Sequence, residues 1–105
     1  MTVIAMLSVA PVVEGSMASE VAKAVAALDA HDVDYETNPM GTVIEADDVD
    51  SLLAAVASAH KAVDGDRVST FLKIDDKRTT DQRASEKVKA VERELGRPAR
   101  SGDEK

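Results

Sequence analysis

YETNPMGTVIEADD, residues 35–48, decides the fold because it joins two short runs in which apolar and polar residues alternate. Such alternation is typical of β-strands with one buried face. Pro39, between the runs, cannot donate a ladder hydrogen bond, and Gly41 tolerates a positive φ angle. The segment from Asn38 to Gly41 is therefore predicted to be a tight hairpin connection.

The rest of the chain extends this hairpin in both directions. Val3 to Val9 form a nearly continuous apolar run, which predicts a central strand, and Ser16 is a candidate N-cap for the helix that follows. Other stretches carry apolar residues at helical or alternating spacing. The expected strands are 3–9, 33–37, 42–45 and 67–74, and the expected helices are 17–30, one from Asp47 or Asp48 to about 63, and 81–95.

The order of these elements indicates an α+β fold. A β-α-β-β-α-β order followed by an extra helix matches the ferredoxin-like split βαβ plan. Right-handed crossovers would place two helices on one face of a four-stranded antiparallel sheet, plus the C-terminal helix. Residues 1–96 are predicted to form this domain. The tail 97–105 lacks apolar periodicity and is predicted to be disordered.

One face of the sheet is expected to remain uncovered. Either register of the first strand leaves an apolar set facing away from the helices, and an exposed apolar face of this kind usually marks a subunit interface or a ligand site. We therefore expect a homodimer or homotetramer, the alternative being that the third helix folds back over the sheet. The alternative sets are Val3, Ala5, Leu7 and Val9, or Ile4, Met6 and Ala10 with Ser8.

Composition limits the classes of function. The 105 residues fit one domain, and 20 acidic against 13 basic residues give a net charge of -7. This charge disfavours nucleic acid and is interpreted as adaptation to high salt. The chain has no cysteine, which fits a reducing cytoplasm. We expect no membrane partner, because no apolar run approaches the length of a membrane span.

Motifs for catalysis and metal binding are missing from the sequence. His31 and His60 have no second ligand at metal-binding spacing, so no metal site is predicted. No serine–histidine–acid set or glycine-rich phosphate loop is present, and PVVEGSMA lacks the arginine that an acylphosphatase would need. An RNA-recognition module would need aromatic residues on its central strands. No catalytic residue, cofactor or enzyme activity is predicted.

Polar residues within apolar or turn segments are candidates for ligand binding. Thr42 can donate to and accept from a ring nitrogen or amino group, and Met40 can pack on a ring with its thioether. Both also suit a purely structural role. Ser8 interrupts an apolar run, where a buried hydroxyl needs a partner, although a neighbouring carbonyl would suffice.

Charged residues support two opposed hypotheses. Glu36 and Asp75 are suited to a cationic ring, whereas Lys73, Lys77 and Arg78 are suited to an anion. The third interpretation is that DDKRTT is a solvated loop before a helix.

Three motifs resemble one protein family. They are SVAP at the end of the first strand, the hairpin YETNPMGTVIE, and FLKIDDKR on the last strand, collinear over residues 2 to about 95. In these segments the chain is similar to the small thiamine-binding family, formerly a domain of unknown function, which includes YkoF-like proteins. Tyr35 and Phe71 are the aromatic residues available to stack on a ring.

The resemblance implies a ferredoxin-like domain that forms dimers or tetramers and binds thiamine or its hydroxymethylpyrimidine part without chemistry. A structural or regulatory oligomer with no thiamine site is the alternative. The resemblance also implies that polar groups of the sheet and hairpin form the pocket. Carried over to this sequence, these are Ser8, Asn38, Met40, Gly41, Thr42, Lys73 and Asp75.

Overall fold

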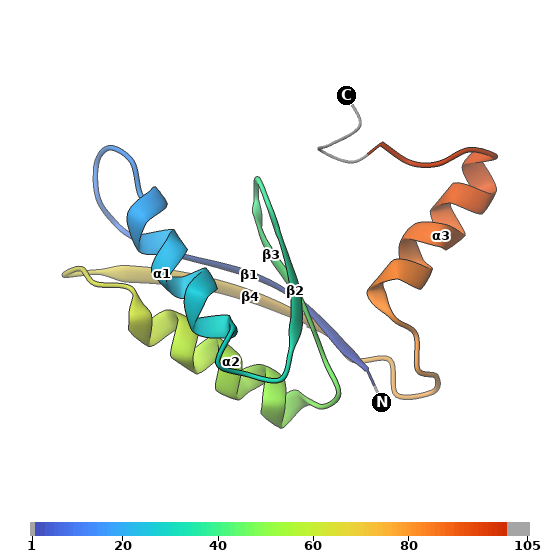
Figure 1. Cartoon of the computed structure of the whole chain (residues 1–105), viewed down its shortest axis with the longest axis horizontal. Helices are drawn as coiled ribbons and strands as arrows, with labels where there is room; N and C mark the ends of the chain where they lie inside the picture. Colours follow the sequence, from blue (N-terminus) through green and yellow to red (C-terminus); the bar gives the residue numbers. More distant parts are fainter. Residues whose placement is uncertain (1, 101–105) are drawn as a thin grey trace.

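The computed structural model describes residues 2–100, which form a four-stranded antiparallel sheet and three helices (Figure 1). The strand order is β2-β3-β1-β4, so the predicted ferredoxin-like α+β fold is confirmed. The elements in chain order are β1 (Val3–Pro11), α1 (Ala18–Leu28), β2 (Asp34–Asn38), β3 (Gly41–Ala46), α2 (Val49–Ala62), β4 (Val68–Asp75) and α3 (Ala84–Leu95).

The hairpin between β2 and β3 has the predicted form. Asn38 pairs with Gly41, and Thr37 pairs with Thr42, so Pro39 and Met40 alone make the turn. Register along both strands follows from this two-residue turn, because each step away from it pairs the next two residues. The predicted hairpin is confirmed.

Helix ends differ slightly from the sequence-based expectation. Met17, not Ser16, occupies the N-cap position of α1, while the Ser16 hydroxyl accepts a hydrogen bond from the Ala18 N–H at 3.3 Å. Asp48 caps α2 as predicted, because its carboxylate accepts from the Ser51 N–H at 2.7 Å. That hydrogen bond holds the pKa of Asp48 below its usual value, since it favours the charged form.

The hydrophobic core lies between the sheet and the pair α1 and α2. Leu28, Ile44, Leu52 and Val3 are its largest fully buried side chains, and each contributes about 1.5–3 kcal/mol by leaving water. Alanine fills most of the remaining positions and lets the helices lie close to the sheet. The other core members are Ala5, Leu7, Val9, Ala24, Ala46, Ala55, Val56, Ala59 and Val63.

The opposite side of the sheet, which we call the open face, carries the alternate residues of each strand. The register of β1 follows from burial: Val3, Ala5, Leu7 and Val9 are buried under the helices, so Ile4, Met6, Ser8 and Ala10 lie on the open face. Ser8 is exposed. The expectation that the Ser8 hydroxyl is buried was therefore wrong, because a strand covered on one face leaves every second residue accessible.

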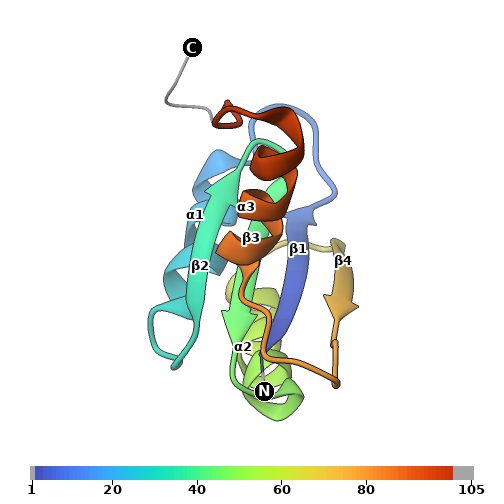
Figure 2. The same ribbon diagram turned by 90° about the vertical axis from the view of Figure 1, so that its right-hand side faces the viewer.

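Helix α3 lies on the open side of the sheet, opposite α1 and α2 (Figure 2). Ion pairs connect its beginning to the strands: Arg83 with Asp34 at 3.3 Å and with Glu45 at 3.2 Å, and Lys87 with Asp75. Its apolar stripe is nevertheless about half exposed, so α3 does not bury this stripe against the sheet. The stripe consists of Val88, Val91 and Leu95.

Residues after α3 are irregular as far as residue 100. The Ala99 N–H donates to the Glu92 carboxylate at 2.8 Å, so this part of the predicted tail turns back toward α3. The rest of the predicted disordered tail, residues 101–105, lies outside the described residues. None of the helices in the described part of the chain is both long enough and apolar enough to cross a membrane.

Candidate functional site

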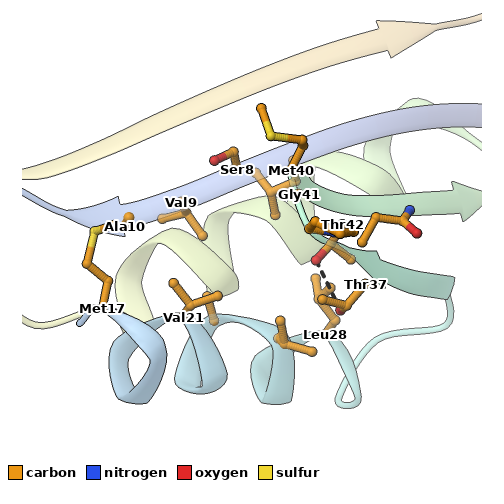
Figure 3. Close-up of a pocket in the computed structure, with 15 residues that line it drawn as sticks. Ser8, Val9, Ala10, Met17, Val21, Leu28, Thr37, Met40, Gly41 and Thr42 are labelled. Atoms are coloured by element: carbon orange, nitrogen blue, oxygen red, sulfur yellow. Dashed lines mark hydrogen bonds between the residues drawn. The ribbon is translucent and has the colours of Figure 1, made fainter. Parts of the chain in front are cut away.

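A cavity opens where β1 extends past its neighbour β3. The pairing of β1 with β3 ends at Leu7 and Thr42, whereas β1 continues beside β4 as far as Pro11. The hairpin turn and α1 close the space beside this free part of β1, as Figure 3 shows. The cavity measures about 210 Å³, and we call it the hairpin cavity. Its lining is Leu7, Ser8, Val9, Ala10, Met17, Val21, Ala24, Val25, Leu28, Thr37, Asn38, Pro39, Met40, Gly41 and Thr42.

Two threonine hydroxyls meet at the hairpin end of this cavity. The Oγ1 atoms of Thr37 and Thr42 lie 3.2 Å apart, and either can be the donor (Figure 3). Thr42 is 5% exposed, so its hydroxyl has little access to bulk water. One hydroxyl proton is used between the two oxygens, which leaves the pair one proton and free lone pairs to offer to a ligand. Asn38 adds a half-buried amide beside them.

The remaining walls of the hairpin cavity are apolar. Val21 and Leu28 of α1, with its N-cap residue Met17, lie across the cavity from β1 (Figure 3). Met40 lies at the turn and is 83% exposed. Methionine side chains are flexible and polarisable, and they contact aromatic rings favourably. The walls therefore suit the faces of a flat ring.

The size and charge of the hairpin cavity restrict its ligand. The described residues that line it are all uncharged. A charged group buried there would have no counter-ion and would be unfavourable. The volume of about 210 Å³ is below the range of about 300–1,000 Å³ that is usual for drug-sized ligands. A single neutral ring with polar edges fits these limits.

Gly41 brings the hairpin against β1. A Cβ atom at this position would lie 2.8 Å from the Leu7 carbonyl oxygen and 2.9 Å from the Met6 sulfur. Its φ angle of 157° is positive, as the sequence predicted, and L side chains rarely adopt this backbone conformation. Glycine is therefore favoured here for two reasons, the positive φ angle and the close approach of two backbones.

The predicted site residues divide between the hairpin cavity and the part of the open face around β4. Ser8, Asn38, Met40, Gly41 and Thr42 line the hairpin cavity, and Lys73 and Asp75 do not. These last two lie on the open face, paired in register with Met6 and Ile4 of β1.

Charged residues around β4 interact with one another. Lys87 of α3 hydrogen-bonds to Asp75 and holds the pKa of that carboxyl below its usual value. Arg78 pairs with Asp76 at 3.1 Å. The DDKR segment thus makes ion pairs of its own, away from the hairpin cavity.

Thr37 and the helical wall were absent from the sequence-based set. Thr37 was predictable, because a two-residue turn at Pro39 and Met40 places it directly opposite Thr42. The approach of Met17, Val21 and Leu28 depends on how α1 crosses the sheet. No local pattern in the sequence specifies that crossing.

The aromatic side chains available for stacking lie outside the hairpin cavity. The Tyr35 hydroxyl donates to the Asp29 carboxylate, and this hydrogen bond raises the pKa of Tyr35. Phe71 is 63% exposed and belongs to the open face. Across residues 2–100, no group of three His, Asp or Glu side chains is arranged to hold a metal ion.

Comparison with known proteins identifies the class of protein that this fold and cavity define. The family model described as "Thiamine-binding protein" matches residues 5–92. The chain therefore belongs to the thiamine-binding protein family, as its motifs indicated.

Two relatives illustrate this membership. The UPF0045 protein of Methanothermobacter thermautotrophicus is 47% identical over 83 residues, which cover 76% of this chain and 84% of that protein. The UPF0045 protein MJ1052 of Methanocaldococcus jannaschii is 39% identical over 92 residues, or 85% of this chain and 91% of the relative. A crystal structure of MJ1052 has a TM-score of 0.80 and covers 86% of this chain and 95% of its own.

Proposed function

We propose that this protein binds thiamine, or its hydroxymethylpyrimidine part, in the hairpin cavity and performs no chemistry on it. The observation that carries this proposal is a cavity of single-ring size, lined by uncharged side chains, with a hydroxyl pair at one end. Membership of the thiamine-binding family supports the identity of the ligand. Its setting is proposed to be the cytoplasm, where a chain without cysteine loses nothing to reduction.

The pyrimidine ring suits the interior of the cavity better than the thiazolium ring does. The aminopyrimidine carries neutral donors and acceptors, which the hydroxyls of Thr37 and Thr42 and the Asn38 amide can match. The thiazolium ring is cationic, and none of the carboxylates in residues 2–100 lines the cavity. In this proposal the pyrimidine is enclosed and the thiazolium remains at the solvent side.

The affinity of the hairpin cavity for thiamine or hydroxymethylpyrimidine should be moderate. Two or three neutral hydrogen bonds contribute about 1 kcal/mol each, and burial of a small ring adds a similar amount per buried carbon group. The sum corresponds to a dissociation constant of roughly micromolar order. Titration calorimetry with thiamine, the free hydroxymethylpyrimidine and thiamine phosphate tests this expectation.

Substitution of Thr42 tests whether the ligand binds in the hairpin cavity. Thr42→Val keeps the shape of the buried side chain but removes its hydroxyl, so the ligand and Thr37 both lose a partner. We expect affinity to fall about fivefold to thirtyfold, from the loss of one to two net hydrogen bonds of about 1 kcal/mol each. Thr80→Val, at an exposed position in the connector before α3, is the matched control and should bind like the parent. Unchanged affinity in Thr42→Val would place the ligand elsewhere.

We also propose that the protein acts as a homodimer or homotetramer. The open face carries partly buried Ile4, Met6 and Val43 beside the exposed ring of Phe71, and the stripe of α3 is half exposed on the same side. Partly exposed apolar side chains on an uncovered sheet face are typical of a subunit interface. A second copy of the chain would cover it.

A structural or regulatory oligomer without a thiamine site is the second candidate, and the same open face favours it. Calorimetry separates the two candidates. If none of the three ligands releases or absorbs heat at millimolar concentration while the oligomer persists, the structural candidate is correct.

A further inference from the structure

The main chain of β1, and not only its side chains, forms part of the wall of the hairpin cavity. Four consecutive residues, from Leu7 to Ala10, line the cavity. Successive side chains of a strand point to opposite faces of the sheet, so a cavity on one face would meet only every second one. Consecutive lining residues mean that the cavity lies against the edge of the strand, where the main chain itself is accessible.

Hydrogen bonding fixes which main-chain groups point toward this edge. The N–H and C=O of one residue in an antiparallel strand point to the same side, and successive residues alternate. The Val12 N–H donates to the Arg67 carbonyl at 2.8 Å, toward β4. The Leu7 carbonyl, in contrast, lies against Gly41 on the β3 side. By alternation, Ser8 and Ala10 pair with β4.

Val9 therefore directs its N–H and C=O toward the β3 side, where β3 has already ended. The last pair between β1 and β3 is Leu7 with Thr42. The residue that would face Val9 is Met40, which belongs to the turn and is 83% exposed. Among residues 2–100, no backbone hydrogen bond joins Val9 to the turn or to α1. Pro11, next on this edge, has no N–H.

We propose that the Val9 N–H and C=O bind the donor–acceptor edge of the ligand ring, in the position that a longer β3 would occupy. This inference rests on the proposed function and adds its main recognition contact. A buried amide N–H and C=O are nearly always paired in proteins, and Val9 is a buried residue. The ligand ring would supply the hydrogen-bond partners that the Val9 N–H and C=O lack.

An aminopyrimidine has the required arrangement of atoms. Its exocyclic amino group donates to the Val9 carbonyl, while the adjacent ring nitrogen accepts from the Val9 N–H. An extended peptide adds to a sheet edge through the same pair of main-chain contacts. The ring then lies in the plane of the sheet, between the α1 side chains and the open side. The hydroxyls of Thr37 and Thr42 remain for the other polar groups of the ligand.

Amide hydrogen exchange on the nitrogen-15-labelled full chain tests the free edge directly. Without ligand, we expect the Val9 amide to exchange about 10²-fold or more faster than the amides of Leu7 and Ala10, which are paired with β3 and β4. With thiamine at about 100 times its dissociation constant, Val9 exchange should slow by about 100-fold. Leu7 and Ala10 are the internal controls.

The outcomes separate this inference from the proposed function. Slow exchange of Val9 in the free protein overturns the inference, because the edge would already be paired. If calorimetry shows binding but Val9 exchange stays fast at saturation, the inference is also wrong and the proposed function stands. If no ligand binds at all, the proposed function fails, and the inference fails with it.

A ligand analogue provides a second, independent test. The same hydroxymethylpyrimidine without its exocyclic amino group leaves the Val9 carbonyl without a donor. Its affinity should be about fivefold to tenfold weaker, from the loss of one hydrogen bond and the burial of an unpaired carbonyl. Equal affinity for the two pyrimidines contradicts the proposed edge contact.

Discussion

The helix-covered face and the open face of the sheet are made of the same strands, and alternate residues of β1 separate them. On the covered face, Val3, Ala5, Leu7 and Val9 are buried against α1 and α2. On the open face, Ile4 and Met6 are only partly buried, and Ser8 is exposed. The helix on that side, α3, is attached by ion pairs and not by apolar packing.

This difference separates the determinants of folding from those of the proposed association. Apolar burial supplies the free energy of folding, and it is concentrated on the covered face. Exposed ion pairs contribute little to stability, so α3 adds an apolar surface without adding much to the core. The open face is then free to bind a partner, while the covered face keeps the subunit folded.

Paired leucine substitutions in α2 give the largest expected effect. Leu52 is 0% exposed and faces the sheet, whereas its neighbour Leu53 is 44% exposed. Leu52→Ala should lower the free energy of unfolding by about 2–5 kcal/mol. Leu53→Ala should change it by about 1 kcal/mol or less. Urea unfolding measures both, and equal losses would show that the core extends beyond the covered face.

Substitution on the open face should change association and leave folding almost intact. Phe71→Glu places a charge in the centre of the proposed subunit interface, where its desolvation is unfavourable. We expect light scattering to show a species of 11.1 kDa, the mass of one subunit, in place of a larger parent. Leu53→Glu adds the same charge on the opposite side and should keep the parent mass. An unchanged mass for Phe71→Glu would remove the open face from the interface.

Salt should raise the stability of the folded domain and weaken the attachment of α3. The net charge of -7 repels itself, and the screening length falls from about 10 Å at 0.1 M salt to about 3 Å at 1 M. The melting temperature should therefore rise over this range, as expected of a chain adapted to high salt. A flat or falling melting temperature would contradict that interpretation.

The attachment of α3 should weaken under the same conditions, because screening reduces the ion pairs of Arg83 and Lys87. Limited proteolysis of the connector before α3, with a salt-tolerant protease, measures this effect. Cleavage that becomes slower in high salt would show that apolar contacts hold α3.

Removal of the tail should have the smallest effect. Truncation after Gly96 deletes residues 97–105, of which the described part makes one hydrogen bond to α3 through the Ala99 N–H. The free energy of unfolding should change by about 0.5 kcal/mol or less, so the melting temperature should be almost unchanged. The oligomer mass should differ only by the mass of the deleted residues. A large loss in either would assign the tail to the subunit interface.

Much of the fold was predictable because its signals are local. Alternation, helical spacing, the Asp48 cap and the Pro39–Met40 turn each depend on residues close together in the chain. Ends of helices were less certain, since Met17 replaces Ser16 at the cap of α1. The exposure of Ser8 depended on which face the helices cover, and the apolar run around it was compatible with either register.

The hairpin cavity could be predicted only in part. Thr42 and Gly41 belong to a motif that is visible in the sequence, but the cavity exists because β1 is longer than β3. That mismatch depends on where two distant strands stop pairing, and the Val9 main chain has no sequence signature at all. Lys73 and Asp75 were grouped with the hairpin although β4 carries them to the open face.

The close contact at Gly41 has a consequence for how the family can vary. A Cβ atom at residue 41 would collide with the carbonyl of Leu7, a backbone atom that cannot rotate away. Met40, one residue earlier, is almost free in solvent. A saturation library selected for folded protein should therefore contain no replacement at residue 41 and nearly every replacement at residue 40. The contrast in tolerated substitutions between these two adjacent positions would locate the contact between the hairpin and β1 from sequence data alone.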